Sequence, residues 1–324
     1  MNRKTIKAIL TKKFNEWLES IDDEVVKSKV KTNTIITGGC ITSMFLGEPV
    51  NDFDLYFTDK ETTKAVAEYY VRKFNEKNGK HSNKCGFNHS AFVIDGALPI
   101  AEQIKLAGED VWDTGMLQQI PEDRIKIIVR SDGVASEDES DQTHYDIIDD
   151  ADEINEAELD QEDTGEKYRP IFLSTNAITL SNKVQIVVRF HGKPEEIHSN
   201  FDFVHCTNYW TSDDSQLYTS TEALESILSK TLRYNGSKYP LCSIIRTRKF
   251  IKRGWHINAG QYLKMAFQLN ELNLNDVTVL EEQLVGVDTL YFMSMIDQIK
   301  RRQQNDPDFK FDSCYVCSII DKIF

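Results

Sequence analysis

Asp52 and Asp54, two aspartates separated by a single residue, are the side chains of this sequence best suited to chemistry. The apolar residues around them predict a strand over 52–57. Side chains two positions apart on a strand project from the same face, so the two carboxylates should lie together. Such a pair repels itself unless a cation lies between its members. Because Mg²⁺ takes oxygen ligands and keeps coordination positions for phosphates, the pair predicts a divalent-metal site.

A Gly-Gly turn precedes the aspartates. Gly38 and Gly39 follow a short β-rich run and lead into a predicted helix over 41–47. Glycine allows the backbone to approach a phosphate closely, and the N-terminus of a helix favours an anion. Thr42 and Ser43 would add hydroxyl donors at the same place. The turn, the helix and the paired carboxylates together predict a site for a metal-bound phosphate.

This arrangement resembles the nucleotidyltransferase superfamily related to DNA polymerase β. Members of that superfamily place a Gly-Gly or Gly-Ser turn shortly before Asp-x-Asp and take a third carboxylate from a later strand. Asp202, in the strand-like run 201–206, is the residue that matches the third position. The resemblance implies an enzyme in which Asp52, Asp54 and Asp202 hold two Mg²⁺ ions, or Mn²⁺ in their place. An acceptor hydroxyl would attack the α-phosphate of a nucleoside triphosphate, and pyrophosphate would leave.

A second resemblance concerns residues 243–258, which are similar to the neck helix of bacterial poly(A) polymerases and CCA-adding enzymes. Arg246, Lys249 and Arg253 match the basic positions of that helix and share one helix face. Such a face would bind a triphosphate or an RNA backbone, although a basic helix face is also a common solvated surface. Asn176 matches an Asn-Ala element that contacts the nucleotide in the same family. The resemblance implies an RNA acceptor, namely a tRNA-like 3′ end.

Two departures from that family leave the acceptor open. The run Arg-Arg-Asp-Phe-Thr is absent before Asn176, and the nucleotide-selecting motif Glu-Asp-x-x-Arg is absent after the neck. An alternative keeps nucleotidyl transfer but moves the nucleotide to a hydroxyl of a protein or of a small molecule, as in toxin-like or antibiotic-modifying relatives. A third hypothesis is a protein that binds nucleotide or RNA without turnover.

The order of the expected elements predicts an α+β fold, in which a nucleotidyltransferase-type head with a mixed sheet precedes a mostly helical tail. We place the head at residues 1–212 and the basic, helical tail at 213–324. Apolar periodicity predicts helices and strands at the following places: helices over 4–20 and 61–77, and strands over 34–37, 124–130, 171–180, 183–190 and 201–206.

The formal net charge of −14 is unevenly distributed along the chain. Residues 131–166 contain 16 acidic residues and neither Lys nor Arg, whereas residues 230–253 contain eight basic residues and no acidic one. The acidic stretch has too few apolar residues to form a core, so we interpret it as a disordered insertion in the head. The charge of the whole chain therefore does not exclude a nucleic-acid partner.

The remaining composition indicates a cytoplasmic protein without a membrane partner. No apolar run approaches the length that spans a bilayer, and the N-terminal residues have the pattern of an amphipathic helix instead of a signal peptide. The six cysteines are scattered through the sequence, which fits reduced thiols better than a disulfide framework. The sequence does not determine the oligomeric state.

Overall fold

The computed structural model describes residues 1–85, 89–99, 102, 120–131, 167–274, 276, 279, 280 and 283. Apart from Ser131, the acidic stretch 131–166 lies outside the described residues. The described chain forms two compact units. The first contains the residues up to 131 together with 167–199 and 205–228, and the second contains 200–204 and the residues from 229 onward. The first unit thus continues beyond the expected boundary at residue 212, and the segment around Asp202 belongs to the second.

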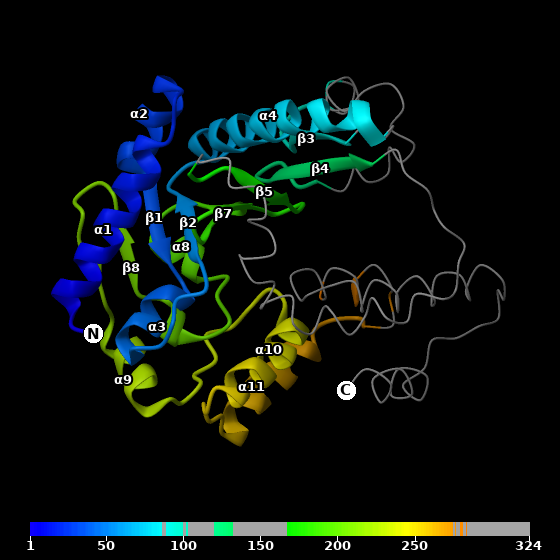
Figure 1. Ribbon diagram of the computed structural model, residues 1–324. Helices are drawn as coiled ribbons and strands as arrows, with labels where there is room; N and C mark the ends of the chain where they lie inside the picture. Colours follow the sequence, from blue (N-terminus) through cyan, green and yellow to red (C-terminus); the bar gives the residue numbers. More distant parts are fainter. Residues whose placement is uncertain are drawn as a thin grey trace, which may run out of the picture. The chain divides into compact units, whose positions relative to one another are not determined.

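A seven-stranded mixed sheet is the centre of the first unit, with strand order β5-β6-β7-β2-β1-β8-β9 (Figure 1). Only the β2–β7 pair is parallel, and the other neighbours are antiparallel. The strands have these bounds: β1 Thr34–Thr37, β2 Phe53–Phe57, β5 Pro170–Leu173, β6 Ala177–Leu180, β7 Val184–His191, β8 Tyr209–Thr211 and β9 Leu217–Tyr218.

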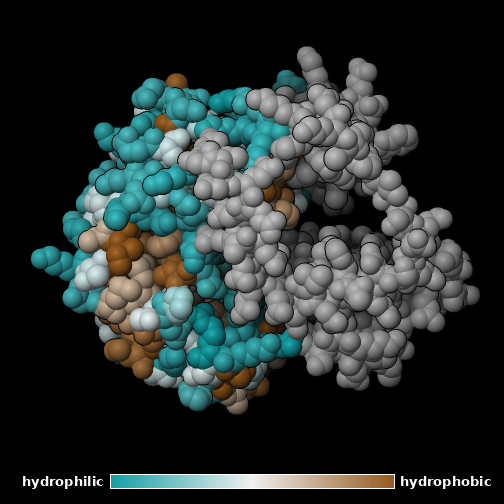
Figure 2. Space-filling model, viewed as in Figure 1, coloured by the Kyte–Doolittle hydropathy of each residue, from teal (hydrophilic) through white to brown (hydrophobic). Residues whose placement is uncertain are grey.

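One face of this sheet forms the hydrophobic core with helices α1 (Arg3–Glu19), α2 (Glu24–Asn33) and α4 (Lys60–Cys85). Each helix contributes its apolar side, and the side turned to solvent is mostly hydrophilic over α2 and α4 (Figure 2). The indole N–H of Trp17 donates to the hydroxyl of Tyr70 at 2.8 Å, which joins α1 to α4 inside the core. Burial of these apolar side chains is the main force that fixes the helices on the sheet.

The opposite face of the sheet carries a row of polar side chains across four adjacent strands. Thr179, Gln185, Asp54 and Thr37 are successive register partners on β6, β7, β2 and β1. Their sequence neighbours are buried and apolar, for example Ile178, Leu180, Val184, Ile186 and Leu55. Because side chains alternate along a strand, these four residues point away from the hydrophobic core. We refer to Thr179, Gln185, Asp54 and Thr37 as the polar row.

A two-stranded antiparallel sheet, β3 (His89–Asp95) with β4 (Ile125–Ser131), adjoins α4. Asp95 at the end of β3 pairs with Lys60 at 2.7 Å and with Lys64 at 3.1 Å, one turn apart on α4. These ion pairs hold the end of the small sheet on the helix.

In the second unit, the described residues form α10 (Pro240–Lys252) and α11 (Ala259–Leu269), and α9 (Thr221–Ser229) ends where this unit begins. Phe203 is buried in the second unit, with its ring 5.4 Å from that of Phe250 and 6.2 Å from that of Tyr234. No helix in the described part of the chain is both long enough and apolar enough to cross a membrane.

The mixed sheet, followed by helices, confirms the predicted α+β class. Two of the expected strands were wrong in detail. Residues 171–180 form two antiparallel strands, because a turn at 174–176 interrupts the run. Residues 201–206 form a bend, a single bridge at Phe203 and the 3-10 helix η3 (Val204–Cys206), not a strand. Phe203 packs there against the rings of Tyr234 and Phe250 instead of lying in a strand.

Candidate active site

The Gly-Gly turn lies directly against the second aspartate. Strands β1 and β2 pair so that Thr37 is opposite Asp54. The next residue, Gly38, has a φ of +93°, which L-amino acids rarely adopt. A Cβ atom placed on Gly38 would lie 2.9 Å from Oδ2 of Asp54, closer than such atoms approach. Both the backbone conformation and the nearby carboxylate therefore require glycine at position 38.

The charges of the Asp52 and Asp54 carboxylates both affect the pKa of one thiol, that of Cys40. Strand β2 begins at Phe53, so Asp52 immediately precedes it. Burial raises the pKa of the Cys40 thiol well above its usual range, and the negative charges of Asp54 and then of Asp52 raise it further. Since such an effect weakens with distance, both carboxylates lie near Cys40 in the first turn of α3 (Gly39–Leu46). Asp52 is exposed and Asp54 is partly exposed, so the pair is accessible to solvent.

Two of the residues predicted to bind a phosphate already donate to acceptors inside the protein. The hydroxyl of Thr42 donates to the carbonyl of His205 at 2.8 Å, and the N–H of Gly38 donates to the carbonyl of Cys206 at 3.2 Å. Thr42 is 3% exposed and Ser43 is 6% exposed. These two hydrogen bonds join the Gly-Gly turn and α3 to residues 205 and 206.

Asn176 lies in the turn between β5 and β6. Its carbonyl accepts the N–H of Val188 at 2.9 Å, and its own N–H donates to the hydroxyl of Ser174 at 3.4 Å. The backbone of Asn176 thus closes the turn. The predicted contact of Asn176 with a nucleotide stays a prediction.

Thr37 links the turn to a buried histidine that sequence reasoning did not single out. Its Oγ1 lies 2.9 Å from the carbonyl of Asn208 and 2.9 Å from Nε2 of His198. A carbonyl only accepts, so the Thr37 hydroxyl donates to Asn208, and Nε2 of His198 must carry the proton that it donates to Thr37. Burial lowers the pKa of His198 to about 4, although the charge of Glu195 acts in the opposite direction. His198 is therefore neutral near pH 7 and helps to fix the residue that precedes Gly38.

We expect the stability of the protein to decrease between about pH 6.5 and pH 4 because of His198. In this interval His198 binds a proton in the unfolded chain but not in the folded chain, so acid favours the unfolded chain. The loss attributable to this residue is about 3 kcal/mol. Urea unfolding at pH 7 and pH 4.5 should show a smaller loss for His198→Gln, whose amide can still donate to Thr37. The exposed His256, replaced by Gln, is the control. Equal pH dependence in His198→Gln and the parent would contradict the expectation.

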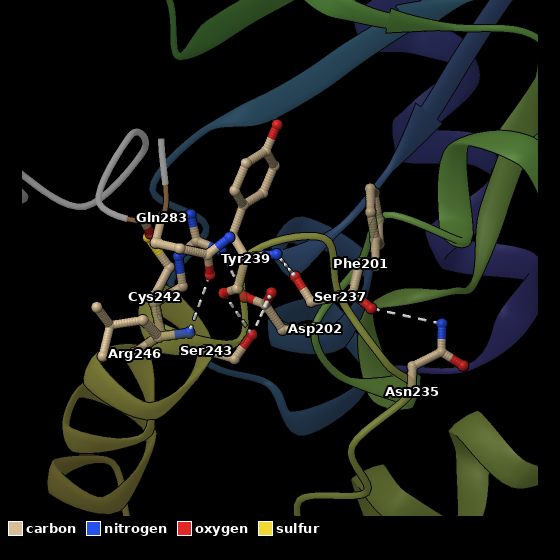
Figure 3. A network of polar contacts seen from close by, with 10 residues as sticks. Phe201, Asp202, Asn235, Ser237, Tyr239, Cys242, Ser243, Arg246 and Gln283 are labelled. Atoms are coloured by element: carbon tan, nitrogen blue, oxygen red, sulfur yellow. Dashed lines mark hydrogen bonds and ion pairs between the residues drawn. The ribbon is translucent and has the colours of Figure 1, made fainter. Parts of the chain in front are cut away.

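Asp202, the predicted third carboxylate, is bound to α10 in the second unit (Figure 3). It is 8% exposed. Its Oδ1 accepts the hydroxyl of Ser243 at 2.8 Å, and its Oδ2 forms an ion pair with Nη1 of Arg246 at 2.5 Å. The carbonyl of Asp202 also accepts the N–H of Asn235 at 2.8 Å. These contacts favour a structural role, in which Asp202 joins the segment 200–204 to α10.

We expect Asp202→Asn and Arg246→Gln each to lower the free energy of unfolding by about 2 kcal/mol, the usual loss for a hydrogen bond to a charged group. The double variant should lose less than the sum of the two, because both remove the same ion pair. Thermal unfolding measures these effects, with the exposed Arg248, replaced by Gln, as the control. Unchanged stability of Asp202→Asn, together with weaker Mn²⁺ binding, would instead make Asp202 a metal ligand.

The three residues of the predicted RNA-binding face differ in their surroundings. Arg246 is partly buried and paired with Asp202, Lys249 is exposed in the last turn of α10, and Arg253 is the C-cap residue. Lys252 also lies in the last turn. Cations at the C-terminus of a helix are stabilised by the helix dipole, so the helix itself accounts for part of this positive charge.

The paired aspartates are the best candidate for a divalent ion. In the described part of the chain, no group of three or more His, Cys, Asp or Glu side chains is placed to hold a metal ion. A pair of carboxylates nevertheless suits Mg²⁺, which retains several water molecules and commonly binds one or two carboxylates plus phosphate. Glycine at position 38 allows the turn to lie directly against Oδ2 of Asp54. The residues present thus fit Mg²⁺ bound together with a phosphate.

Comparison with known proteins gives one family and two structures. Residues 8–230 match the model of a family described as Gabija anti-defense 2 family protein. Among solved structures, the chain is similar to the Thermotoga maritima CCA-adding enzyme complexed with tRNA, with 10% identity, a TM-score of 0.37, and coverage of 97% of this chain and 57% of that one. It is also similar to a tRNA nucleotidyltransferase complexed with a primer tRNA and an incoming ATP analogue, with 10% identity, a TM-score of 0.31, and coverage of 86% and 61%.

The chain therefore spans about three-fifths of the length of each of these two enzymes. The search of curated proteins found no match.

Proposed function

We propose a function for this chain, which belongs to the Gabija anti-defense 2 family. In this proposal, the protein transfers a nucleoside monophosphate from a nucleoside triphosphate to an acceptor hydroxyl and releases pyrophosphate. The observation that carries this proposal is the contact between the Gly-Gly turn and Asp54, where Oδ2 of Asp54 leaves no room for a Cβ atom on residue 38. This contact places a partly exposed carboxylate, with Asp52 nearby, at the start of helix α3.

In the proposed reaction, an oxygen of the acceptor hydroxyl forms a bond to the α-phosphorus, and the bond from that phosphorus to the pyrophosphate oxygen breaks. The hydroxyl proton passes to solvent. Asp52 and Asp54 would hold Mg²⁺, which supplies positive charge to the phosphates. The remaining task of the protein is to orient the triphosphate, because positioning and charge neutralisation account for most of the catalysis in such transfers. We base the site on Asp52 and Asp54 alone, since the contacts of Asp202 favour a structural role.

Two acceptors have specific support. The RNA 3′ end proposed from the sequence is supported by the basic residues at the end of α10, among them the exposed Lys249. A protein hydroxyl is supported by the name of the family, which describes action against a defence called Gabija. Covalent attachment of a nucleotide to a component of that defence would be a direct way to inactivate it.

One labelling experiment tests the reaction and separates the two acceptors. The purified protein is incubated with MgCl₂ and each of the four nucleoside triphosphates, labelled either at the α- or at the γ-phosphate. Total RNA, total protein from cells that carry the Gabija defence, or buffer alone is added. We expect the α-label to enter one of the two fractions and the γ-label to be released as pyrophosphate.

Asp54→Asn is the control for contaminating enzymes and should abolish incorporation. Transfer of the γ-label instead of the α-label would identify phosphoryl transfer and overturn the proposal. Absence of α-label from every fraction, with both the parent and Asp54→Asn able to bind nucleotide, would leave only a binding function.

A further inference from the structure

Beyond the two aspartates, the polar row contains a side chain with the chemistry to bind phosphate. Gln185 on β7 is the parallel register partner of Asp54 on β2. It is partly exposed, and its neighbours Val184 and Ile186 are buried on the opposite face at 1% and 0%. Adjacent strands are about 4.8 Å apart, so the side chain of Gln185 begins next to that of Asp54. Thr179 lies one strand further along the same row.

The donors around the Gly-Gly turn are already used within the protein, so Gln185 is a candidate for the donor that a phosphate requires. A triphosphate needs hydrogen-bond donors as well as cations, because its oxygens only accept. Three donors in and next to the Gly-Gly turn already have acceptors: the Gly38 N–H donates to Cys206, the Thr42 hydroxyl to His205 and the Thr37 hydroxyl to Asn208. Each of these acceptors is a backbone carbonyl that holds the turn in place.

The side chains of Gln185 and Thr179 differ from these three donors in their hydrogen bonding. Within the described residues, neither side chain has a hydrogen-bond partner, although each carries N–H or O–H donors on the face of Asp54. A glutamine amide has two N–H donors and no charge, whereas a carboxylate at the same place would repel the phosphate oxygens. The Gln185 amide can therefore donate to a phosphate beside the two carboxylates without adding to their negative charge.

We propose that Gln185 binds the triphosphate of the nucleotide through its amide N–H groups and positions the α-phosphate beside Asp54. The hydroxyl of Thr179, on the adjacent strand β6, is the next donor in the polar row. This inference rests on the proposed function, because it uses the same site. Gln185 is a substrate-contacting residue in this proposal and not a metal ligand. The two roles differ in a measurable way. Loss of a metal ligand weakens metal binding even without nucleotide, whereas loss of a phosphate ligand weakens only the binding of the nucleotide.

Two binding measurements separate these roles. Binding of Mn²⁺ alone is followed by electron paramagnetic resonance. Binding of inorganic tripolyphosphate, which has the phosphates but no base, is followed by calorimetry in saturating MgCl₂. We expect Gln185→Ala to leave Mn²⁺ binding unchanged and to weaken tripolyphosphate binding roughly tenfold or more, as expected for a lost hydrogen bond to a charged group.

Gln185→Glu should tighten Mn²⁺ binding and weaken tripolyphosphate binding, because it exchanges a donor for a negative charge. Gln216, an exposed residue that accepts a hydrogen bond from Lys7 and lies beside β9 at the far edge of the sheet, provides the matched controls Gln216→Ala and Gln216→Glu. Both controls should resemble the parent. Circular dichroism establishes that all four variants are folded.

The outcomes distinguish this inference from the proposed function. If Gln185→Ala binds tripolyphosphate like the parent, or if it loses Mn²⁺ in the absence of phosphate, the assignment of Gln185 to the phosphate is wrong. Asp54→Asn is measured in parallel. Loss of Mn²⁺ binding in Asp54→Asn with no effect of Gln185→Ala would refute the inference alone, whereas unchanged Mn²⁺ binding in Asp54→Asn would remove the metal site and the proposed function with it.

Discussion

Replacement of Asp54 by Asn is expected to abolish nucleotidyl transfer and Mn²⁺ binding while the protein stays folded. Asparagine keeps the shape of the side chain beside Gly38 but removes the charge that holds a divalent ion. A loss of roughly 10³-fold in the rate of transfer is the scale seen when one charge-stabilising group is removed from an active site. Asp52→Asn should have a similar effect.

Stability provides the second readout for this variant. Removing one of two neighbouring like charges costs the folded state little, so the free energy of unfolding should change by less than about 1 kcal/mol. The charge of Asp54 also raises the pKa of Cys40, so this pKa should fall in Asp54→Asn, although burial keeps it raised. Asp213→Asn, at an exposed turn of the same unit, is the control and should retain activity. Near-normal transfer by Asp54→Asn would show that the site is elsewhere.

Gly38→Ala is expected to have the second large effect, on both stability and metal binding. A residue other than glycine at a φ of +93° costs about 1–3 kcal/mol. In addition, the new Cβ atom would lie 2.9 Å from Oδ2 of Asp54, so the carboxylate or the turn must move. Displacement of this carboxylate should weaken Mn²⁺ binding and slow the transfer, even at temperatures where the variant is folded.

The neighbouring glycine is a matched control. A Cβ atom on Gly39 would meet nothing within 4 Å, and Gly39 is the first residue of α3. Gly39→Ala should therefore leave metal binding unchanged and stability equal or slightly higher, because alanine restricts the unfolded chain. Thermal unfolding and Mn²⁺ titration of the two variants test the difference. If Gly38→Ala and Gly39→Ala behave alike, the close approach of the turn to Asp54 has no functional meaning.

Local sequence patterns predicted the elements that carry the site. The apolar alternation of 52–57 and the β-rich run 34–37 predicted β2 and β1, and the glycines between them predicted the turn that the structure contains. The periodicity of the first helix was equally informative, since Ile6, Leu10, Phe14 and Trp17 are all buried. Such patterns succeed because burial on one side of an element leaves a period in the sequence.

The same reasoning failed where contacts between distant residues decide the structure. The aromatic residues around Asp202 alternate as in a strand, yet Phe203 packs against the rings of Tyr234 and Phe250 in the second unit, and no strand forms there. Sequence patterns also gave no sign that Thr42 and Gly38 would donate to the carbonyls of His205 and Cys206. None of these contacts leaves a local pattern, because Phe203 lies more than 30 residues from its partners, and Thr42 and Gly38 lie more than 150 residues from theirs.

The sequence by itself determined the α+β class, the turn and the two aspartates, since each depends on residue type and spacing over a short segment. Only the tertiary structure decided which side chains surround Asp54. The parallel pairing of β2 with β7 places Gln185 beside it, and the packing of helix α8 (Pro194–His198) places His198 next to Thr37. Strand order and register depend on how the whole hydrophobic core is closed, so one sequence segment cannot specify its neighbours.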